Sequence, residues 1–202
     1  MLGGYVDTDL TVALRIDNGS ETGREAVRLS QEISLVCPVL FQLNSQGTIH
    51  VSVFQGRFPA ETIDEVRQIV KGFSRTIVAR MQERLFLRPN GNIFWNLEHN
   101  VAIAALHKEC LKVLRPMTGG RLMKQFSDIL GAGASEKNSQ LIKKWGFLLA
   151  DDEFLPHVTL CRLSDLTDQA FTEQIKVQPV DLGLHDLILG EIDYSGNIVK
   201  VI

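Results

Sequence analysis

Two segments of the sequence place a histidine two positions before a hydroxyl side chain. His50 precedes Ser52 in GTIHVSVFQGRF, and His157 precedes Thr159 in FLPHVTLCRL. Both segments alternate apolar and polar residues, a pattern typical of a β-strand, on which residues two apart point to the same side. Each motif is therefore predicted to present an imidazole and a hydroxyl together from a rigid strand.

Two histidines and two hydroxyls suit chemistry at a phosphate. Histidine titrates near pH 6.5, so one imidazole can accept a proton while the other donates one. The base would activate water or a hydroxyl on one side of phosphorus, and the acid would protonate the departing oxygen on the other side. The two hydroxyls would hydrogen bond to the non-bridging oxygens as charge builds there. This chemistry needs no metal ion, and we expect neither a metal nor another cofactor.

Other site chemistries fit the sequence less well. Serine and threonine are poor zinc ligands, and the chain has neither a G-x-S-x-G elbow nor a G-x-x-x-x-G-K-[ST] phosphate loop. Cys161 shares the alternation of His157 and could be a nucleophile, but no sequence feature activates its thiol. The remaining alternative is that both motifs are exposed or hydrogen-bonded strand histidines without a catalytic role.

The flanking sequence predicts the elements that position these motifs. Alternation and helical spacing give strands and helices in both halves of the chain. In the first half we expect strands at 11–17, 34–44, 48–54, 76–88 and 92–98, with helices at 21–33 and 61–73. Pro38 indicates that its strand is an edge strand or is bulged. The turn at Asn90-Gly91 predicts a hairpin.

The rest of the chain is predicted to be helical first and then to return to the earlier pattern. Helices are expected at 99–117, 121–130 and 136–145, and again at 168–177. Residues 146–163 read as strand, acidic turn and strand, and residues 182–202 as a hairpin. His107 lies near the apolar stripe of its helix and is predicted to be packed and hydrogen bonded.

The two halves of the sequence resemble each other. Ile49–Val53 matches Pro156–Leu160, and a Gly-Asn turn follows about forty residues later in each half, at Gly91-Asn92 and at Gly196-Asn197. We therefore predict an α+β fold of two pseudo-symmetric lobes, each an antiparallel sheet backed by helices, with a central cleft that holds both motifs.

In this interpretation the chain is one bilobal domain over residues 1–202. The lobes are formed by repeats at about 34–97 and 146–202, and residues 98–145 are a helical insertion.

The paired motifs resemble those of the 2H phosphoesterase superfamily, the group of 2'-5' RNA ligase-like proteins and cyclic phosphodiesterases. The closer match is FLPHVTLCRL, in which Pro156 precedes the histidine and Arg162 follows it by five residues. HVSVFQGRF is similar but has serine where threonine is commoner. The resemblance covers most of the chain from about residue 34, and extends toward the strand at 11.

The resemblance implies hydrolysis of a cyclic or linear phosphodiester, such as a 2',3'-cyclic phosphate on a nucleotide or an RNA end. His50 and His157 would be the catalytic acid and base, in an order that depends on the orientation of the substrate. Ser52 and Thr159 would bind the phosphate. The partner would be a small nucleotide or an RNA terminus.

Two more residues are candidates for substrate binding. Arg162 matches an arginine often seen in this superfamily, and a cation near phosphate is electrostatically reasonable. Strand alternation points it away from His157 unless the strand twists or bulges. Phe54 shares the alternation of His50 and could stack on a base, although the sequence favours core packing for it.

Two other functions stay open at this stage. A non-catalytic module could use the same cleft to hold a nucleotide or an RNA end. A 2'-5' RNA ligase-type transferase could use it to transfer phosphate to a second hydroxyl in place of water.

Composition limits the class of partner and the compartment. A formal net charge of -3 argues against a broad grip on duplex nucleic acid. The three cysteines, Cys37, Cys110 and Cys161, lack CxxC spacing and are predicted to be buried free thiols in a reducing compartment. The N-terminus does not read as a signal peptide, and no apolar run approaches the length of a membrane span. We expect a cytoplasmic monomer that does not bind membranes.

Overall fold

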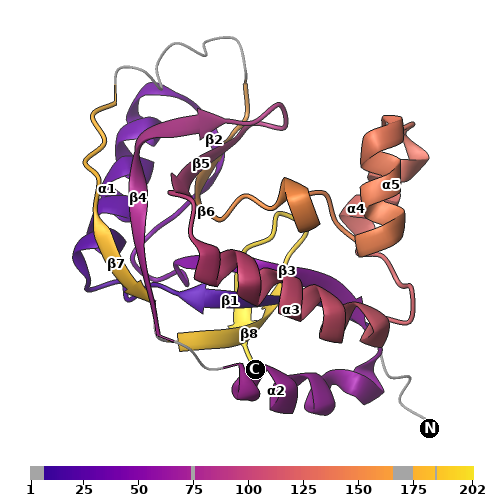
Figure 1. The fold of residues 1–202 in the computed structure, drawn as a ribbon. Helices are drawn as coiled ribbons and strands as arrows, with labels where there is room; N and C mark the ends of the chain where they lie inside the picture. The colour runs from indigo at the N-terminus through magenta and orange to yellow at the C-terminus, as the bar shows by residue number, and fades with distance from the viewer. Residues whose placement is uncertain (1–6, 74–75, 166–174, 185) are drawn as a thin grey trace, which may run out of the picture.

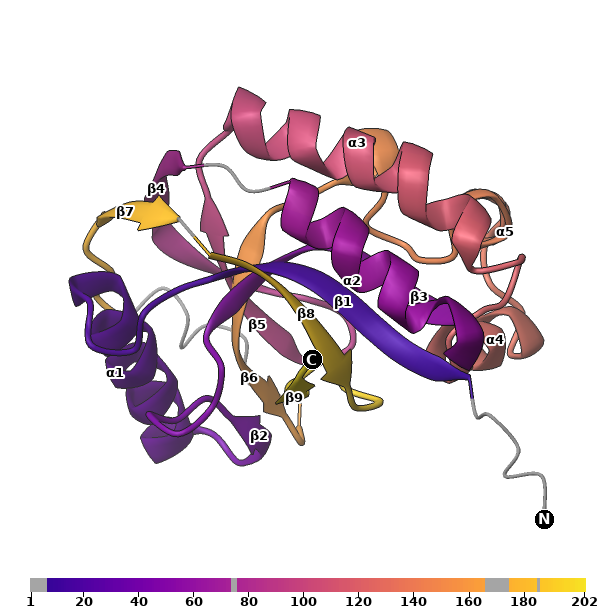
Figure 2. The same ribbon diagram turned by 90° about the horizontal axis from the view of Figure 1, so that it is seen from below.

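Two antiparallel sheets form the framework of the protein. The computed structural model describes residues 7–73, 76–165, 175–184 and 186–202. Sheet A has the strand order β3-β1-β8-β9, and sheet B has the order β2-β6-β5-β4-β7 (Figures 1 and 2). His50 is the first residue of β3 and His157 the first residue of β6, so the two motifs lie on different sheets.

Every described pair of neighbouring strands is antiparallel. The strands of sheet A are β1 (Thr8–Arg15), β3 (His50–Phe58), β8 (Asp186–Ile192) and β9 (Ile198–Val201). Those of sheet B are β2 (Val39–Gln42), β4 (Ile77–Leu87), β5 (Asn92–Leu97), β6 (His157–Leu163) and β7 (Asp181–Leu184).

Helices cover the sheets, as the prediction of an α+β fold requires. Helix α1 (Glu21–Val36) packs on β2 and β6 of sheet B, whereas α2 (Ile63–Gly72) and α3 (Val101–Met117) pack on β8 and β3 of sheet A (Figure 2). Short α4 (Lys124–Gly131) and α5 (Glu136–Trp145) follow α3. One continuous apolar cluster joins both layers, and the predicted fold class is confirmed.

The strands of the two predicted repeats are divided between the two sheets. Residues 34–97 supply strands to both sheets, since β3 joins sheet A while β2, β4 and β5 join sheet B. Residues 146–202 are divided in the same way, with β6 and β7 in sheet B and β8 and β9 in sheet A. Alternation along one strand does not encode its hydrogen-bonding partners, so the sequence repeat did not reveal this exchange of strands between sheets.

Two element boundaries also differ from the prediction. The strand expected at 34–44 begins only at Val39, because α1 continues to Val36 and ends where Pro38 favours extended backbone at Cys37. Residues 146–150 form no strand. They begin at the left-handed Gly146 that ends α5, and three of them, 147–149, line a cavity. Residues 168–174 of the helix expected at 168–177 lie outside the described residues.

The buried imidazole of His107 connects α3 to both histidine-bearing parts of the chain. Its Nδ1–H donates to the Val53 carbonyl of β3 at 2.6 Å, and its Nε2 accepts from the Asp151 amide, six residues before β6, at 2.9 Å. Phe154 stacks on the ring with 3.8 Å between centroids. Nε2 accepts only when it is unprotonated, and burial lowers the pKa of His107. The predicted packed, hydrogen-bonded role is confirmed.

Replacement of His107 should destabilise the protein much more than replacement of an exposed histidine. His107→Ala leaves a buried carbonyl and a buried amide without their partner, which should lower the free energy of unfolding by about 2–5 kcal/mol. Urea unfolding measures this loss. His99, which is exposed, provides the control, and His99→Ala should change the free energy by less than about 0.5 kcal/mol. Equal effects of the two substitutions would contradict the role given to His107.

Candidate active site

A β-bulge interrupts each histidine-bearing strand immediately after its hydroxyl residue. On β3, Ser52 lies opposite Ala13 and Phe54 lies opposite Val12, so Val53 is the extra residue. On β6, the same register shift leaves Leu160 as the extra residue between Thr159 and Cys161. A bulge reverses the alternation of all residues that follow it.

The bulge on β3 turns Phe54 toward the core, in agreement with the core packing that the sequence favoured. Its side chain is only 1% exposed and points to the core side of the strand. It packs against Phe58 and Phe147, at centroid distances of 6.0 and 5.7 Å. Although Phe54 contributes to the wall of the cavity, its ring is held in aromatic packing and cannot stack face to face on a base.

The second bulge turns Arg162 to the same face of β6 as His157 and Thr159. All three are half-buried, while Val158, Leu160 and their neighbours on the core face are buried. Arg162 does not belong to the lining of the cavity, but it pairs across the sheet with Asn92, which does. Its Nε is buried and has no hydrogen-bond partner among the described residues. Arg162 therefore lies beside the site rather than in it.

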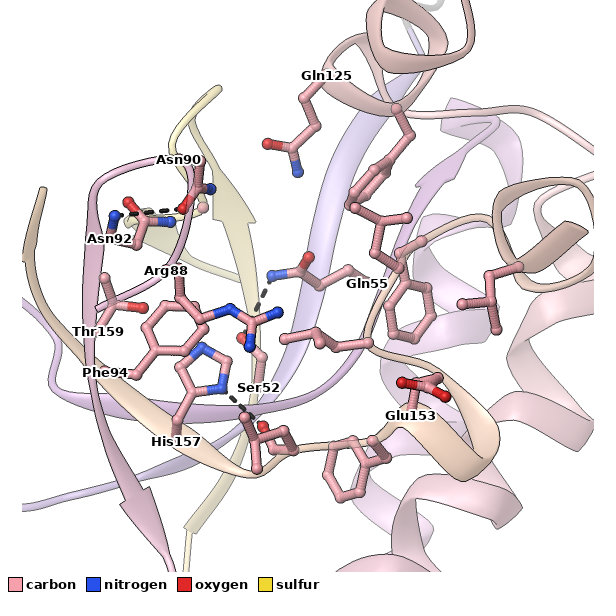
Figure 3. A pocket seen from close by; sticks show the side chains of 18 of the residues that line it. Ser52, Gln55, Arg88, Asn90, Asn92, Phe94, Gln125, Glu153, His157 and Thr159 are labelled. Carbon is pink, nitrogen blue, oxygen red and sulfur yellow. Dashed lines mark hydrogen bonds between the residues drawn. The ribbon is translucent and has the colours of Figure 1, made fainter. Parts of the chain in front are cut away.

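One cavity of about 450 Å³ brings both motifs together. His50 and Ser52 line it from sheet A, and His157 and Thr159 line it from sheet B. In Figure 3, His157 and Thr159 lie on one side of the cavity, with Ser52 behind them on its own strand. The four side chains thus share a cleft between the sheets, as the repeated motif predicts, and their roles in it stay a prediction.

Each histidine is oriented by the same local hydrogen bond. Nδ1 of His50 lies 2.9 Å from the Thr48 carbonyl oxygen, and Nδ1 of His157 lies 2.7 Å from the Leu155 carbonyl oxygen. A carbonyl oxygen only accepts, so Nδ1 carries the hydrogen in both rings. Nε2 of each ring is then the nitrogen left to accept a proton or to bind a ligand.

Both rings are held in the neutral form. The pKa of His157 is lowered to about 4, mainly by burial and also by the positive charge of Arg88 and by any positive charge on His50, against the hydrogen bond to Leu155. Burial also lowers the pKa of His50, partly offset by its hydrogen bond to Thr48. Both rings line the same cavity. At pH 7 the unliganded site therefore presents two bases.

The two hydroxyls differ in their surroundings. Thr11 Oγ1 lies 3.0 Å from both Ser52 Oγ and the Phe54 carbonyl oxygen, and the Gln55 amide lies 3.4 Å from Ser52 Oγ. Because the carbonyl can only accept, Thr11 donates to it, and the Ser52 hydrogen is available to Thr11 or to a ligand. Thr159 also faces the cavity, and its hydroxyl has no comparable hydrogen bond among the described residues.

Sequence reasoning missed a cation and an aromatic ring in the site. Phe94 of β5 stacks on His157, with ring centroids 3.6 Å apart and an interplanar angle of 21°. The guanidinium of Arg88 lies over the Phe94 ring, 5.8 Å from its centroid, and points into the cavity (Figure 3). Arg88 directly precedes the Pro-Asn-Gly turn, and that position was the only sequence signal that could have singled it out.

Two alternative chemistries receive no support from the side chains. Cys161 is fully buried, and burial raises the pKa of its thiol to about 12, so it is not an activated nucleophile. Within the described ranges, no three histidine, cysteine or acidic side chains cluster as metal ligands.

No helix in the described part of the chain has both the length and the apolar character to cross a bilayer.

Comparison with known proteins establishes the fold but not the reaction. No protein-family model matches the sequence, and no curated protein matches it. Among solved structures, the chain is similar to the protein TT0787 of Thermus thermophilus, with a TM-score of 0.60 and 17% sequence identity. The match covers 96% of this chain and 94% of that one. At this identity the two proteins share an architecture, and any activity must be argued from the cavity.

The low pKa of His157 should make stability depend on pH. Between the usual value of about 6.5 and about 4, the unfolded chain binds a proton that the folded protein rejects. The contribution of His157 to the free energy of unfolding should therefore be constant above pH 6.5 and fall toward pH 4. The share of His157 is at most about 3 kcal/mol.

Urea unfolding at pH 7, 5.5 and 4.5 tests this prediction. His157→Gln should flatten the loss of stability on acidification, although His50 and His107 still contribute with the same sign. His99→Gln serves as the control and should keep the wild-type slope. An unchanged slope in His157→Gln would show that this ring is not held neutral by folding.

Proposed function

We propose that the protein is a metal-independent phosphodiesterase of the 2H phosphoesterase type, which opens a 2',3'-cyclic phosphate on a nucleotide or an RNA end. The observation that carries the proposal is the pair of imidazoles, each anchored through Nδ1, in one cavity between two sheets. Two Nε2 atoms from separate elements can face opposite sides of one phosphorus atom, as in-line displacement requires.

Substrate binding would supply the acid that the free site lacks. An anionic phosphate between the rings favours the charged form of an adjacent imidazole and raises its pKa. One histidine then becomes protonated, while the other stays neutral and acts as base. The orientation of the substrate decides which ring takes each role.

The proposed reaction balances without any further reactant. The neutral histidine takes a proton from water, whose oxygen forms a bond to phosphorus while the bond from phosphorus to the 2' or 3' oxygen breaks. The protonated histidine gives its proton to that departing oxygen. The two rings exchange protonation states, and solvent restores the starting state.

The other polar groups of the cavity would stabilise the charge that develops on the phosphate. The Ser52 and Thr159 hydroxyls can donate to non-bridging oxygens, and Arg88 adds a positive charge. Arg88 also lowers the pKa of His157, which keeps that ring neutral until an anion offsets the cation.

Each histidine should be indispensable for hydrolysis of 2',3'-cyclic AMP. His50→Ala or His157→Ala should lower kcat about 10²–10⁴-fold, because each removes the acid or the base. Activity should persist in EDTA. Chromatography of the products measures the rate and also separates hydrolysis from transfer to a second hydroxyl.

The exposed His99 again provides the matched control, and His99→Ala should keep the wild-type kcat. Full activity in either site variant would refute acid-base catalysis by the pair. Binding of the cyclic nucleotide without turnover would instead identify a binding module, and activity abolished by EDTA would refute metal independence.

A further inference from the structure

The cavity has a second wall that the proposed chemistry does not use. Opposite the histidines, the side chains of α4, α5 and the segment after α5 are mostly apolar. They are Phe126, Ile129, Leu141, Phe147, Leu148 and Phe154. Figure 3 shows the separation: Arg88, Phe94 and His157 lie on one side, and Gln125 and Glu153 lie on the other among the hydrocarbon side chains.

Part of this wall remains accessible from the cavity. Ile129, Leu141 and Leu148 are half-buried, whereas Phe126 and Phe147 are buried, at 8% and 5% exposure. Apolar surface that lines a pocket next to a polar site gains by covering an apolar part of a ligand. A bare phosphate or a charged sugar phosphate would leave that surface wet.

Polar groups at the edge of the apolar wall restrict the kind of ligand further. Gln125 of α4 and Asn138 of α5 line the cavity, and their side-chain amides have no hydrogen-bond partner within the described ranges. An amide offers a donor and an acceptor side by side, the arrangement that matches the edge of a nucleobase. Lys137 and Glu153 pair at 2.6 Å and tie α5 to the residues just before β6.

We propose that α4, α5 and residues 147–149 form a subsite for a flat, uncharged heteroaromatic ring, and that this subsite selects a nucleobase beside the reacting phosphate. The inference rests on the proposed function for the position of the phosphate at the histidines. The cavity of about 450 Å³ has room for a ligand of the size of one nucleotide. In this proposal, α4 and α5 select the ring of the ligand, and β3 and β6 carry the histidines that act on its phosphate.

The test compares phosphate ligands with and without the ring. Calorimetry should show that the wild-type protein binds adenosine 2'-monophosphate at least about tenfold more tightly than glycerol 2-phosphate. Leu141→Gln keeps the length of the side chain and the helix propensity but places an amide in the apolar wall. This variant should lose most of the preference for adenosine 2'-monophosphate without weaker binding of glycerol 2-phosphate.

Two further variants provide a control and an independent test of the apolar wall. Lys143→Ala changes an exposed residue of the same helix and should keep the wild-type preference. Ile129→Asn disturbs the wall from α4 and should act like Leu141→Gln, so the test does not depend on the folding of one variant. Circular dichroism confirms that each variant is folded.

Equal affinities of the wild-type protein for the two ligands would overturn the proposal, as would a preference that survives both wall variants. Hexyl phosphate binding as tightly as adenosine 2'-monophosphate would show an aliphatic subsite and overturn the assignment of a ring. If the preference holds but 2',3'-cyclic AMP is not hydrolysed, the proposed function fails and the subsite stands. If 2',3'-cyclic AMP is hydrolysed but the preference for adenosine 2'-monophosphate is absent, the subsite fails and the proposed function stands.

Discussion

The hydrogen bond from Nδ1 of each histidine to the carbonyl two residues earlier is the interaction on which the candidate site depends. It fixes the tautomer, leaves Nε2 as the nitrogen that can accept a proton, and is made at the strand end itself at both His50 and His157. Burial then keeps both rings neutral. In the proposed reaction, one of these two neutral rings becomes the acid only when an anionic ligand raises its pKa.

The fold holds these two strand ends against each other by exchanging strands between sheets. Neither sheet is built from one continuous half of the chain. His107 adds a direct connection, because one neutral ring bonds both the bulged residue of β3 and the segment that leads to β6. Through this ring, α3 is hydrogen bonded to both segments that carry the motifs.

The sequence was sufficient for the local features of the site. Alternation around His50 and His157 predicted strands that present a histidine and a hydroxyl together, and the repeated motif predicted a shared cleft. The bulges at Val53 and Leu160 were not predictable, because an extra residue in a ladder depends on the partner strand.

Those two bulges explain why Phe54 turned into the core and why Arg162 turned to the face of His157. Arg88 was missed for a related reason. Its place over Phe94 depends on the pairing of β4, β5 and β6, which no pattern along one segment describes.

The most direct test of the central claim is a long-range ¹H–¹⁵N NMR spectrum of the histidine rings, recorded at pH 7 with and without adenosine 2'-monophosphate. The free protein should show His50 and His157 as neutral Nδ1–H tautomers. Addition of the nucleotide should shift Nε2 of both rings and convert one of them to the doubly protonated form. A ligand that perturbs only one ring, or leaves both neutral, would contradict two histidines acting on one phosphate.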